Sequence, residues 1–293
     1  MRFTEIGQQL RAYRLESGLR AEEIAARLGV SRAALYRYEK GEVIKLDTIK
    51  RLAELLKISP LSLLGIGVEY YMRPIGYFER VRQLEETADQ ILQLSGPVCY
   101  LITSDAYDVV LSDAFEEARM NAPGDRASMR ALSEQVMGIQ AARKRMYGMR
   151  RPGIIAMISG SSIRRFLENG VAGALPLSDR MRRLCREMAA TEVENIASLM
   201  EAEPMGLQFG LLVAAEPTAS FKVLRSRDRA SLAVNPFHPD THPHAETGVA
   251  MVTGADEAVS AHQRVAEANW REAIKGAAAA GHVRQLLVQA RAN

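Results

Sequence analysis

Residues 28–59 read LGVSRAALYRYEKGEVIKLDTIKRLAELLKIS, and this stretch decides the fold of the N-terminal part of the chain. One short helix is predicted over residues 21–29, where a glycine ends it, and a second over residues 32–41. Two short helices joined by a three- or four-residue turn that contains glycine have the spacing of a helix-turn-helix motif. Within the turn, Gly29 is expected to take a left-handed conformation and Ser31 to cap the second helix.

Three further helices are predicted around this pair. Residues 3–18 place apolar side chains at helical spacing, with Thr4 as a candidate N-cap and Gly18 as a stop. Residues 46–57 carry a second apolar face, and a short fifth helix is expected to begin at Ser59 and Pro60. The sequence therefore predicts an all-α, five-helix domain over residues 1–67.

This helix order resembles the XRE family of phage-repressor-like transcription regulators. The family motif opens with Leu-Gly-Val-Ser and closes with Arg, an apolar residue, Glu, any residue and Gly, as residues 28–31 and 37–41 do here. The resemblance covers residues 5–64 and implies a lambda-repressor-like fold that binds DNA. One departure is that the proline usual before the fourth helix is missing, and Leu46 and Asp47 stand in its place.

The resemblance also implies which side chains contact DNA. The second helix of such a motif lies in the major groove, with its N-terminal part toward the base edges. Arg32 and Arg37 can each bind guanine O6 and N7 with two hydrogen bonds, and Arg37 can alternatively bind a phosphate. The residues expected at this interface are Arg20, Ala21, Ser31, Arg32, Ala33, Tyr36 and Arg37.

Two further residues have a structural role in the family. Arg14 and Glu39 resemble an ion pair that the family places between its first and third helices. An arginine on an exposed helix face is, taken alone, more often a solvated residue than a base contact. A protein-interaction module that does not bind DNA is therefore the alternative interpretation of residues 1–67.

The distribution of charge favours DNA as the partner. Residues 1–67 hold 12 Lys and Arg against 8 Asp and Glu, a net charge of +4, whereas the rest of the chain holds 26 against 27. The excess of positive charge thus lies in the first quarter of the sequence. This asymmetry is typical of a nucleic-acid-binding module joined to a domain with another task.

The remaining residues predict a larger domain with both helices and strands. Residues 68–95 are expected to form a linker with a helix over residues 77–94, which links the domains, mediates dimerisation or belongs to the second domain. Residues 96–293 are expected to form an α/β domain with a mixed sheet. Its strand candidates are residues 98–102, 153–158, 207–213, 220–224, 230–234 and 249–252, and its last helices are residues 255–279 and 283–290. This order loosely resembles the sensor-like domains of such regulators, which implies effector binding or assembly.

One loop concentrates histidines. The segment 236–246 contains the candidate ligand or metal residues His238, Asp240, His242 and His244. Imidazole and carboxylate groups are ligands of zinc and other divalent ions. Three prolines in the same segment indicate an extended polar loop between strands, which is the alternative interpretation.

Other motifs are absent or ambiguous. Residues 160–162, Gly-Ser-Ser, follow a predicted strand and precede a helix, so they either bind an anion or only cap the helix. Phosphate-binding loops of the P-loop and dinucleotide types are absent, as is a serine-hydrolase elbow. Cys99 and Cys185 lie far apart, which is typical of reduced thiols in the cytosol. We therefore expect a cytoplasmic protein that is not an enzyme and has no cofactor, signal peptide or membrane span.

Together these observations predict a sequence-specific DNA-binding transcription regulator. We expect it to be a homodimer on double-stranded operator DNA, with a C-terminal domain that binds a small-molecule effector or mediates assembly. The alternatives are an antitoxin-like protein controlled by a protein partner, and an enzyme with a DNA-binding head.

Overall fold

The computed structural model describes residues 3–94, 96–121, 125–213, 219–237 and 248–292. Its first part consists of five helices, which we call the head. These are α1 (Phe3–Ser17), α2 (Ala21–Leu28), α3 (Arg32–Glu39), α4 (Leu46–Leu56) and α5 (Pro60–Leu63). The predicted five-helix domain followed by a larger α/β region with a mixed sheet is thereby confirmed.

Local interactions fix the geometry of the turn between α2 and α3. Gly29 ends α2 in the left-handed region at φ 70°, and the Ser31 side chain accepts a hydrogen bond from the backbone N–H of Ala34 at 3.1 Å. At the other end of α3, the absence of a side chain at Gly7 allows α1 to approach closely. A Cβ atom there would lie 2.6 Å from the carbonyl oxygen of Glu39. A side-chain cap therefore fixes the start of α3, and the close approach of α1 fixes its end.

A seven-stranded sheet forms the centre of the larger part, which we call the α/β region. Its order is β1-β7-β6-β5-β2-β3-β4, and β2, β3 and β4 run parallel while the other neighbours are antiparallel. The strands are β1 (Val68–Tyr71), β2 (Gln90–Leu94), β3 (Gly153–Ser159), β4 (Leu207–Leu212), β5 (Ser220–Arg225), β6 (Ala230–Asn235) and β7 (Ala250–Thr253).

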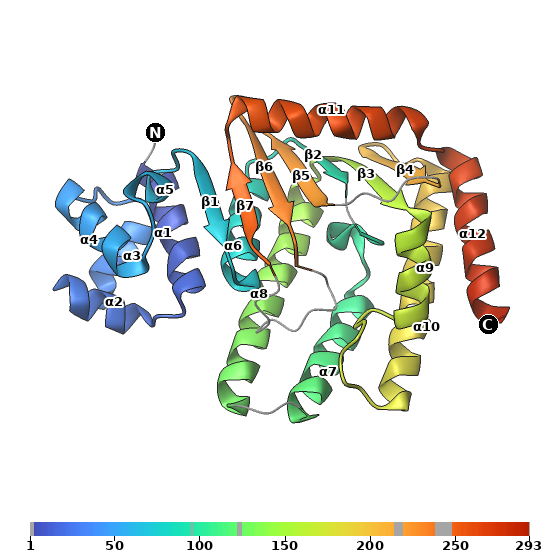
Figure 1. Cartoon of the computed structure of the whole chain (residues 1–293), viewed down its shortest axis with the longest axis horizontal. Coiled ribbons are helices and arrows are strands. Elements are labelled where there is room, and N and C mark those ends of the chain that lie inside the picture. Colours follow the sequence, from blue (N-terminus) through green and yellow to red (C-terminus); the bar gives the residue numbers. More distant parts are fainter. Residues whose placement is uncertain (1–2, 95, 122–124, 214–218, 238–247, 293) are drawn as a thin grey trace.

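Helices cover both faces of this sheet (Figure 1). One face packs on α11 (Asp256–Glu272), and the side chains between them include Phe221, Val223 and Val259. The opposite face is covered by the other helices of the α/β region, and among these α12 packs on α10 and α9. These helices are α6 (Pro74–Glu85), α7 (Asp105–Asn121), α8 (Arg126–Arg150), α9 (Gly160–Asn169), α10 (Asp179–Ala202) and α12 (Gly276–Ala292). None of the helices in the described part of the chain is both long enough and apolar enough to span a bilayer.

Three predicted elements differ from the structure. The helix expected over residues 77–94 is wrong in its second half, because it ends at Glu85 and residues 90–94 form β2 between β3 and β5. Residues 98–102 are not a strand: they form an extended segment followed by a single 3-10 turn, Tyr100–Ile102. The helix expected over residues 255–279 is two helices, separated where Ile274 bridges to Leu211. The division into domains at residues 67 and 95 stays a prediction.

The head is attached to the α/β region by α1, which packs along α6. Arg11 pairs with Glu79 at 2.9 Å, and the Gln83 side chain donates to the backbone carbonyl of Gln8 at 2.9 Å. The backbone N–H groups of Met72 and Arg73 donate to the carboxylate of Glu16. Polar contacts on both sides of the α1–α6 contact thus hold the head in one orientation.

A buried charge cluster strengthens the same junction. Arg80 binds both carboxylate oxygens of Glu69, at 2.7 and 2.8 Å, and Gln9 of α1 donates to that carboxylate at 2.9 Å. The rings of Tyr13 and Tyr71 stack beside it with their centroids 5.3 Å apart. The carboxylate of Glu69 therefore connects β1, α6 and the head.

Candidate DNA interface and candidate effector cavity

The exposed face of α3 carries the predicted base-reading residues. The side chains of Arg32 and Arg37 are 58% and 57% exposed, and Ala33 is exposed as well. Arg32 pairs with Glu22 at 2.7 Å and lies over the ring of Tyr36, with its guanidinium carbon 5.3 Å from the centroid. Both arginines are thus on the surface, and Arg32 is oriented by its neighbours.

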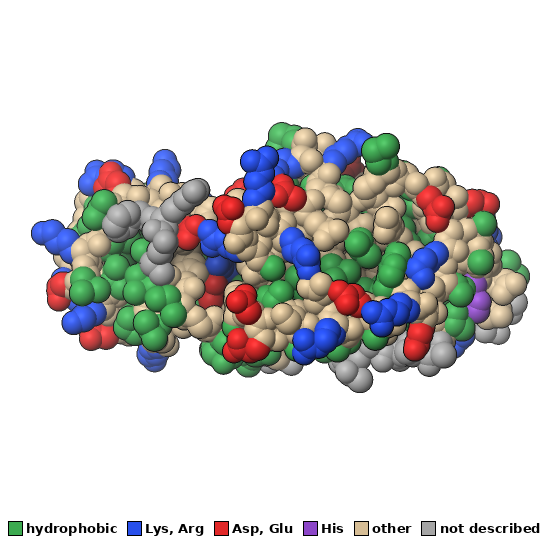
Figure 2. Space-filling view, turned by 90° about the horizontal axis from the view of Figure 1, so that it is seen from above, with side chains coloured by type: hydrophobic (Ala, Val, Ile, Leu, Met, Phe, Trp, Pro, Cys, Tyr) green, Lys and Arg blue, Asp and Glu red, His purple; other side chains and the backbone are tan. Residues whose placement is uncertain are grey.

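Acidic partners lie beside the cations of this face. Arg37 pairs with Glu42 at 2.9 Å, and Arg20 pairs with Glu23 at 3.1 Å. Such exposed pairs contribute little to stability, so exchanging these carboxylates for DNA phosphates or bases costs little. Figure 2 shows the corresponding mixture of Lys, Arg, Asp and Glu side chains at the end of the molecule that the head occupies.

Three predicted contact residues lie at the starts of α2 and α3. Ala21 is 5% exposed at the start of α2, so the structure buries this predicted contact residue. Arg20 precedes it as the N-cap residue, and Ser31 has the same position before α3. The N-terminal ends of both helices of the motif therefore carry exposed residues suited to phosphate. No finding tests the individual contacts, which stay predictions.

Arg14 and Glu39 form an ion pair between α1 and α3. The Nε–Oε1 distance is 2.5 Å, and a second bond joins Nη2 to Oε2 at 3.1 Å. Burial lowers the pKa of Arg14, but the charge and hydrogen bonds of Glu39 outweigh this effect and raise it above the ordinary value. The pair fixes the end of α3 to α1, so it positions the recognition helix.

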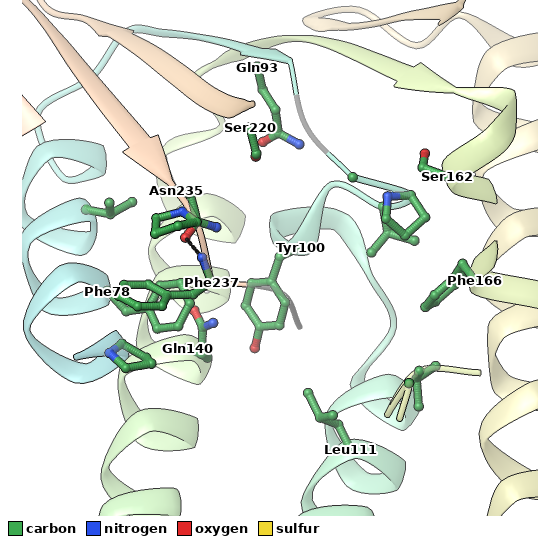
Figure 3. A pocket seen from close by; sticks show the side chains of 18 of the residues that line it. Phe78, Gln93, Tyr100, Leu111, Gln140, Ser162, Phe166, Ser220, Asn235 and Phe237 are labelled. Carbon is green, nitrogen blue, oxygen red and sulfur yellow. Dashed lines mark hydrogen bonds between the residues drawn. The ribbon is translucent and has the colours of Figure 1, made fainter. Parts of the chain in front are cut away.

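The α/β region contains a cavity of about 590 Å³ on the sheet face opposite α11. It lies at the carboxyl ends of β2 and β3 and beside the first residues of β5, between α6, α7, α8 and α9. Figure 3 shows Phe78 and Phe237 on one side of this space and Ser162 and Phe166 on the other. The volume is within the range of sites for small organic molecules.

Aromatic side chains from distant parts of the chain line the cavity. The aromatic rings that line it are those of Tyr77, Phe78, Tyr100, Tyr107, Phe115, Phe166 and Phe237. Polar amides and hydroxyls are interspersed among them, from Gln93, Gln140, Ser159, Ser162, Ser220 and Asn235. The lining therefore suits a molecule with an apolar body and a few polar groups.

Buried charges form one side of the cavity. Glu85, at the end of α6, binds Arg143 with two hydrogen bonds of 2.7 and 2.8 Å and Lys222 with one of 3.2 Å. Burial raises the pKa of Glu85, but the charges of Arg143 and Lys222 outweigh it and keep the pKa below its ordinary value. Burial lowers the pKa of Lys222. Arg143 and Lys222 line the cavity, whereas Glu85 lies behind them.

The sequence indicated only part of this site. Arg143 belongs to a basic run on α8, but the structure separates that run, since Lys144 pairs with Asp108 instead. Lys222 lies between the apolar residues Phe221 and Val223 in a central strand. This alternation in the sequence indicates that Lys222 faces the opposite side of the sheet from Phe221 and Val223. The candidate ligand residues His238, Asp240, His242 and His244 lie outside the described residues, and no group of potential metal ligands occurs among those that are described.

Comparison with known proteins bears on the head. No curated protein matches the chain. A solved structure of TrmBL2, an archaeal chromatin protein with a novel mode of DNA binding, aligns with 90% of this chain and 92% of its own, at 11% identity and a TM-score of 0.31. That similarity is too low to support a conclusion about fold or function. Residues 5–63 match the family model described as a helix-turn-helix domain, and this part of the chain is therefore a helix-turn-helix domain.

Proposed function

We propose that the protein is a sequence-specific, DNA-binding transcription regulator. The observation that supports this most strongly is the helix-turn-helix domain at residues 5–63, whose second motif helix presents Arg32 and Arg37 on its surface. In such domains this helix enters the major groove. The net charge of +4 on residues 1–67 favours association with DNA.

The test is a fluorescence-anisotropy titration of the protein onto its own promoter region and onto random DNA at several salt concentrations. We expect Arg32→Ala and Arg37→Ala each to weaken binding to the promoter fragment about tenfold or more, because a two-bond contact to guanine contributes about 1–3 kcal/mol. Binding to random DNA should change much less. Arg130→Ala serves as the control, since Arg130 is a similarly exposed arginine on α8.

One outcome would contradict the proposal. If wild type binds promoter and random DNA equally, and both head variants behave like Arg130→Ala, the head does not read sequence. A protein-partner role for the head would then be the better interpretation.

We further propose that the cavity binds a small-molecule effector and does not catalyse a reaction. The position of helix α6 supports the effector role, because α6 lies between the cavity and the head. Tyr77, Phe78 and Val81 of α6 line the cavity, while Glu79 and Gln83 of the same helix contact α1. A molecule in the cavity would therefore contact α6, the helix that packs against α1 of the head. A shift of α6 would in turn move α3 relative to DNA.

A further inference from the structure

The charges around the cavity indicate what kind of effector it binds. Three cationic residues line the cavity, Arg143, Arg165 and Lys222, and no Asp or Glu does so among the described residues. Arg143 and Lys222 form a buried cluster with Glu85, which is one carboxylate against two cations. This cluster thus holds an excess positive charge beside a largely apolar space.

An uncompensated charge in such a place is unfavourable without a counter-ion. A buried cation loses hydration, and this cost is recovered only when opposite charge or hydrogen-bond acceptors lie close to it. Glu85 already binds Arg143 through both oxygens and gives Lys222 only a third, longer bond of 3.2 Å. A ligand oxygen at Lys222 would provide the missing negative charge.

The rest of the cavity selects an organic ligand over a bare inorganic ion. The guanidinium carbon of Arg143 lies 5.7 Å from the ring centroid of Phe78 and 5.5 Å from that of Tyr100, so aromatic surface begins directly beside the charge. Phe237 continues this apolar surface beside Phe78, and Phe166 lies across the cavity (Figure 3). The N-terminal end of α9, with Ser162 in the lining, adds a positive dipole end to the same space.

We propose that the cavity binds an organic anion: a ring-containing or otherwise apolar body with one carboxylate or phosphate group that lies against Lys222 and Arg143. This inference rests on the proposed effector role and specifies its ligand. The site is at the carboxyl ends of the parallel strands β2 and β3, beside the antiparallel neighbour β5, where open α/β sheets commonly bind ligands.

The test uses a pair of fluorescent probes that differ in charge. The anionic probe is 1-anilinonaphthalene-8-sulfonate, and its neutral counterpart is N-phenyl-1-naphthylamine. We expect the full-length protein to bind the anionic probe at least tenfold more tightly. Lys222→Met should reduce that affinity about tenfold or more and leave the affinity for the neutral probe nearly unchanged, while Lys222→Arg should retain anion binding.

Controls separate this site from general effects of charge and folding. Arg264→Met removes one positive charge from α11, on the other face of the sheet, and should bind both probes like wild type. Near-ultraviolet circular dichroism shows whether Lys222→Met is folded. If it is not folded, the affinities of wild type and Lys222→Arg for the two probes still decide whether the cavity prefers an anion. Benzoate and phenyl phosphate, tested as competitors against the anionic probe, distinguish a carboxylate from a phosphate ligand.

The possible failures are distinguishable. Equal affinity for the two probes, or an unchanged affinity in folded Lys222→Met, would overturn the anion assignment but leave the effector role intact, since the cavity would then bind neutral molecules. Inorganic phosphate that competes as well as phenyl phosphate would overturn the requirement for an apolar body. Neither result depends on DNA binding, which the promoter titration measures separately.

Discussion

At the scale of single residues, Glu85 makes the stability of the α/β region depend on pH. Its pKa is lowered by Arg143 and Lys222, which outweigh the opposing effect of burial. The ionised carboxylate therefore stabilises the fold above its unfolded pKa of about 4.3, and this contribution is lost as the pH falls through the lower folded pKa. We expect the free energy of unfolding to fall more steeply between about pH 5 and pH 3 in wild type than in Glu85→Gln.

Urea unfolding at several pH values, followed by circular dichroism, measures this difference. Glu85→Gln should be less stable than wild type at pH 7, because two buried cations lose their partner. Glu134→Gln changes an exposed carboxylate of α8 and should keep the wild-type slope. Parallel pH profiles for wild type and Glu85→Gln would show that this cluster is not the source of the pH dependence.

Residue-level prediction from the sequence succeeded where a local rule applies. The roles of Gly29 and Ser31 follow from backbone conformation and from the four unpaired N–H groups at a helix start, which any such turn must satisfy. The partner of Lys222 did not follow from local rules. Glu85 is 137 positions away, and only the packing of α6 against the sheet brings the two together.

At the scale of elements, α6 connects the head to the sheet, and Arg80 links α6 to Glu69 of β1. Replacing Arg80 with Met keeps the length of the side chain but removes two hydrogen bonds from the buried carboxylate of Glu69. Gln9 and Tyr71 still donate to Glu69, but the loss of hydrogen bonds from a charged partner costs about 1–3 kcal/mol, which corresponds to roughly tenfold or more in a local opening equilibrium. We expect amide hydrogens of β1 to exchange faster by about that factor in Arg80→Met.

Hydrogen-exchange mass spectrometry resolves this effect by segment. Exchange in α9 and α10 should stay at the wild-type rate, because these helices do not contact the Glu69 cluster. Arg130→Ala, which removes an exposed arginine, should leave β1 unchanged. Uniformly faster exchange along the chain would instead indicate global destabilisation.

The elements that the sequence misassigned have a common physical cause. Residues 90–94 place Ile91, Leu92 and Leu94 where either a helix face or a strand fits, and the choice depends on hydrogen bonds from β3 and β5. Residues 98–102 form an apolar run without such neighbours, and Val98 and Tyr100 line the cavity instead. Apolar content thus predicted burial in both segments, but the partner strands decided the conformation.

At the scale of the whole molecule, we propose a homodimer that reads two half-sites. Helix-turn-helix regulators bind half-sites about one helical turn apart, and two-fold symmetric dimers fit such operators. We expect sedimentation velocity on the promoter fragment to show two chains per DNA duplex. A single chain per duplex at saturation would contradict the dimer while leaving DNA recognition by the head intact.

The cavity is the feature that the sequence alone did not reveal. Its wall combines residues from Pro74 to Phe237, in four helices and four strands that are separated in the chain. No motif of fixed spacing joins them, because each helix contributes three or four residues and each strand one or two, from elements whose positions depend on the completed sheet. The five-helix head was predictable because its contacts are local.

The pairing of the edge strand β1 with β7 has a consequence for the order in which the protein is made. β1 follows the head directly, yet its hydrogen-bonding partner begins only at Ala250. During synthesis the helix-turn-helix can fold as soon as it leaves the ribosome, since domains generally fold as units from the N-terminus. Its support on the sheet is incomplete until translation has passed Thr253, so a nascent or prematurely terminated chain carries the helix-turn-helix domain without the strand pairing that joins β1 to the sheet.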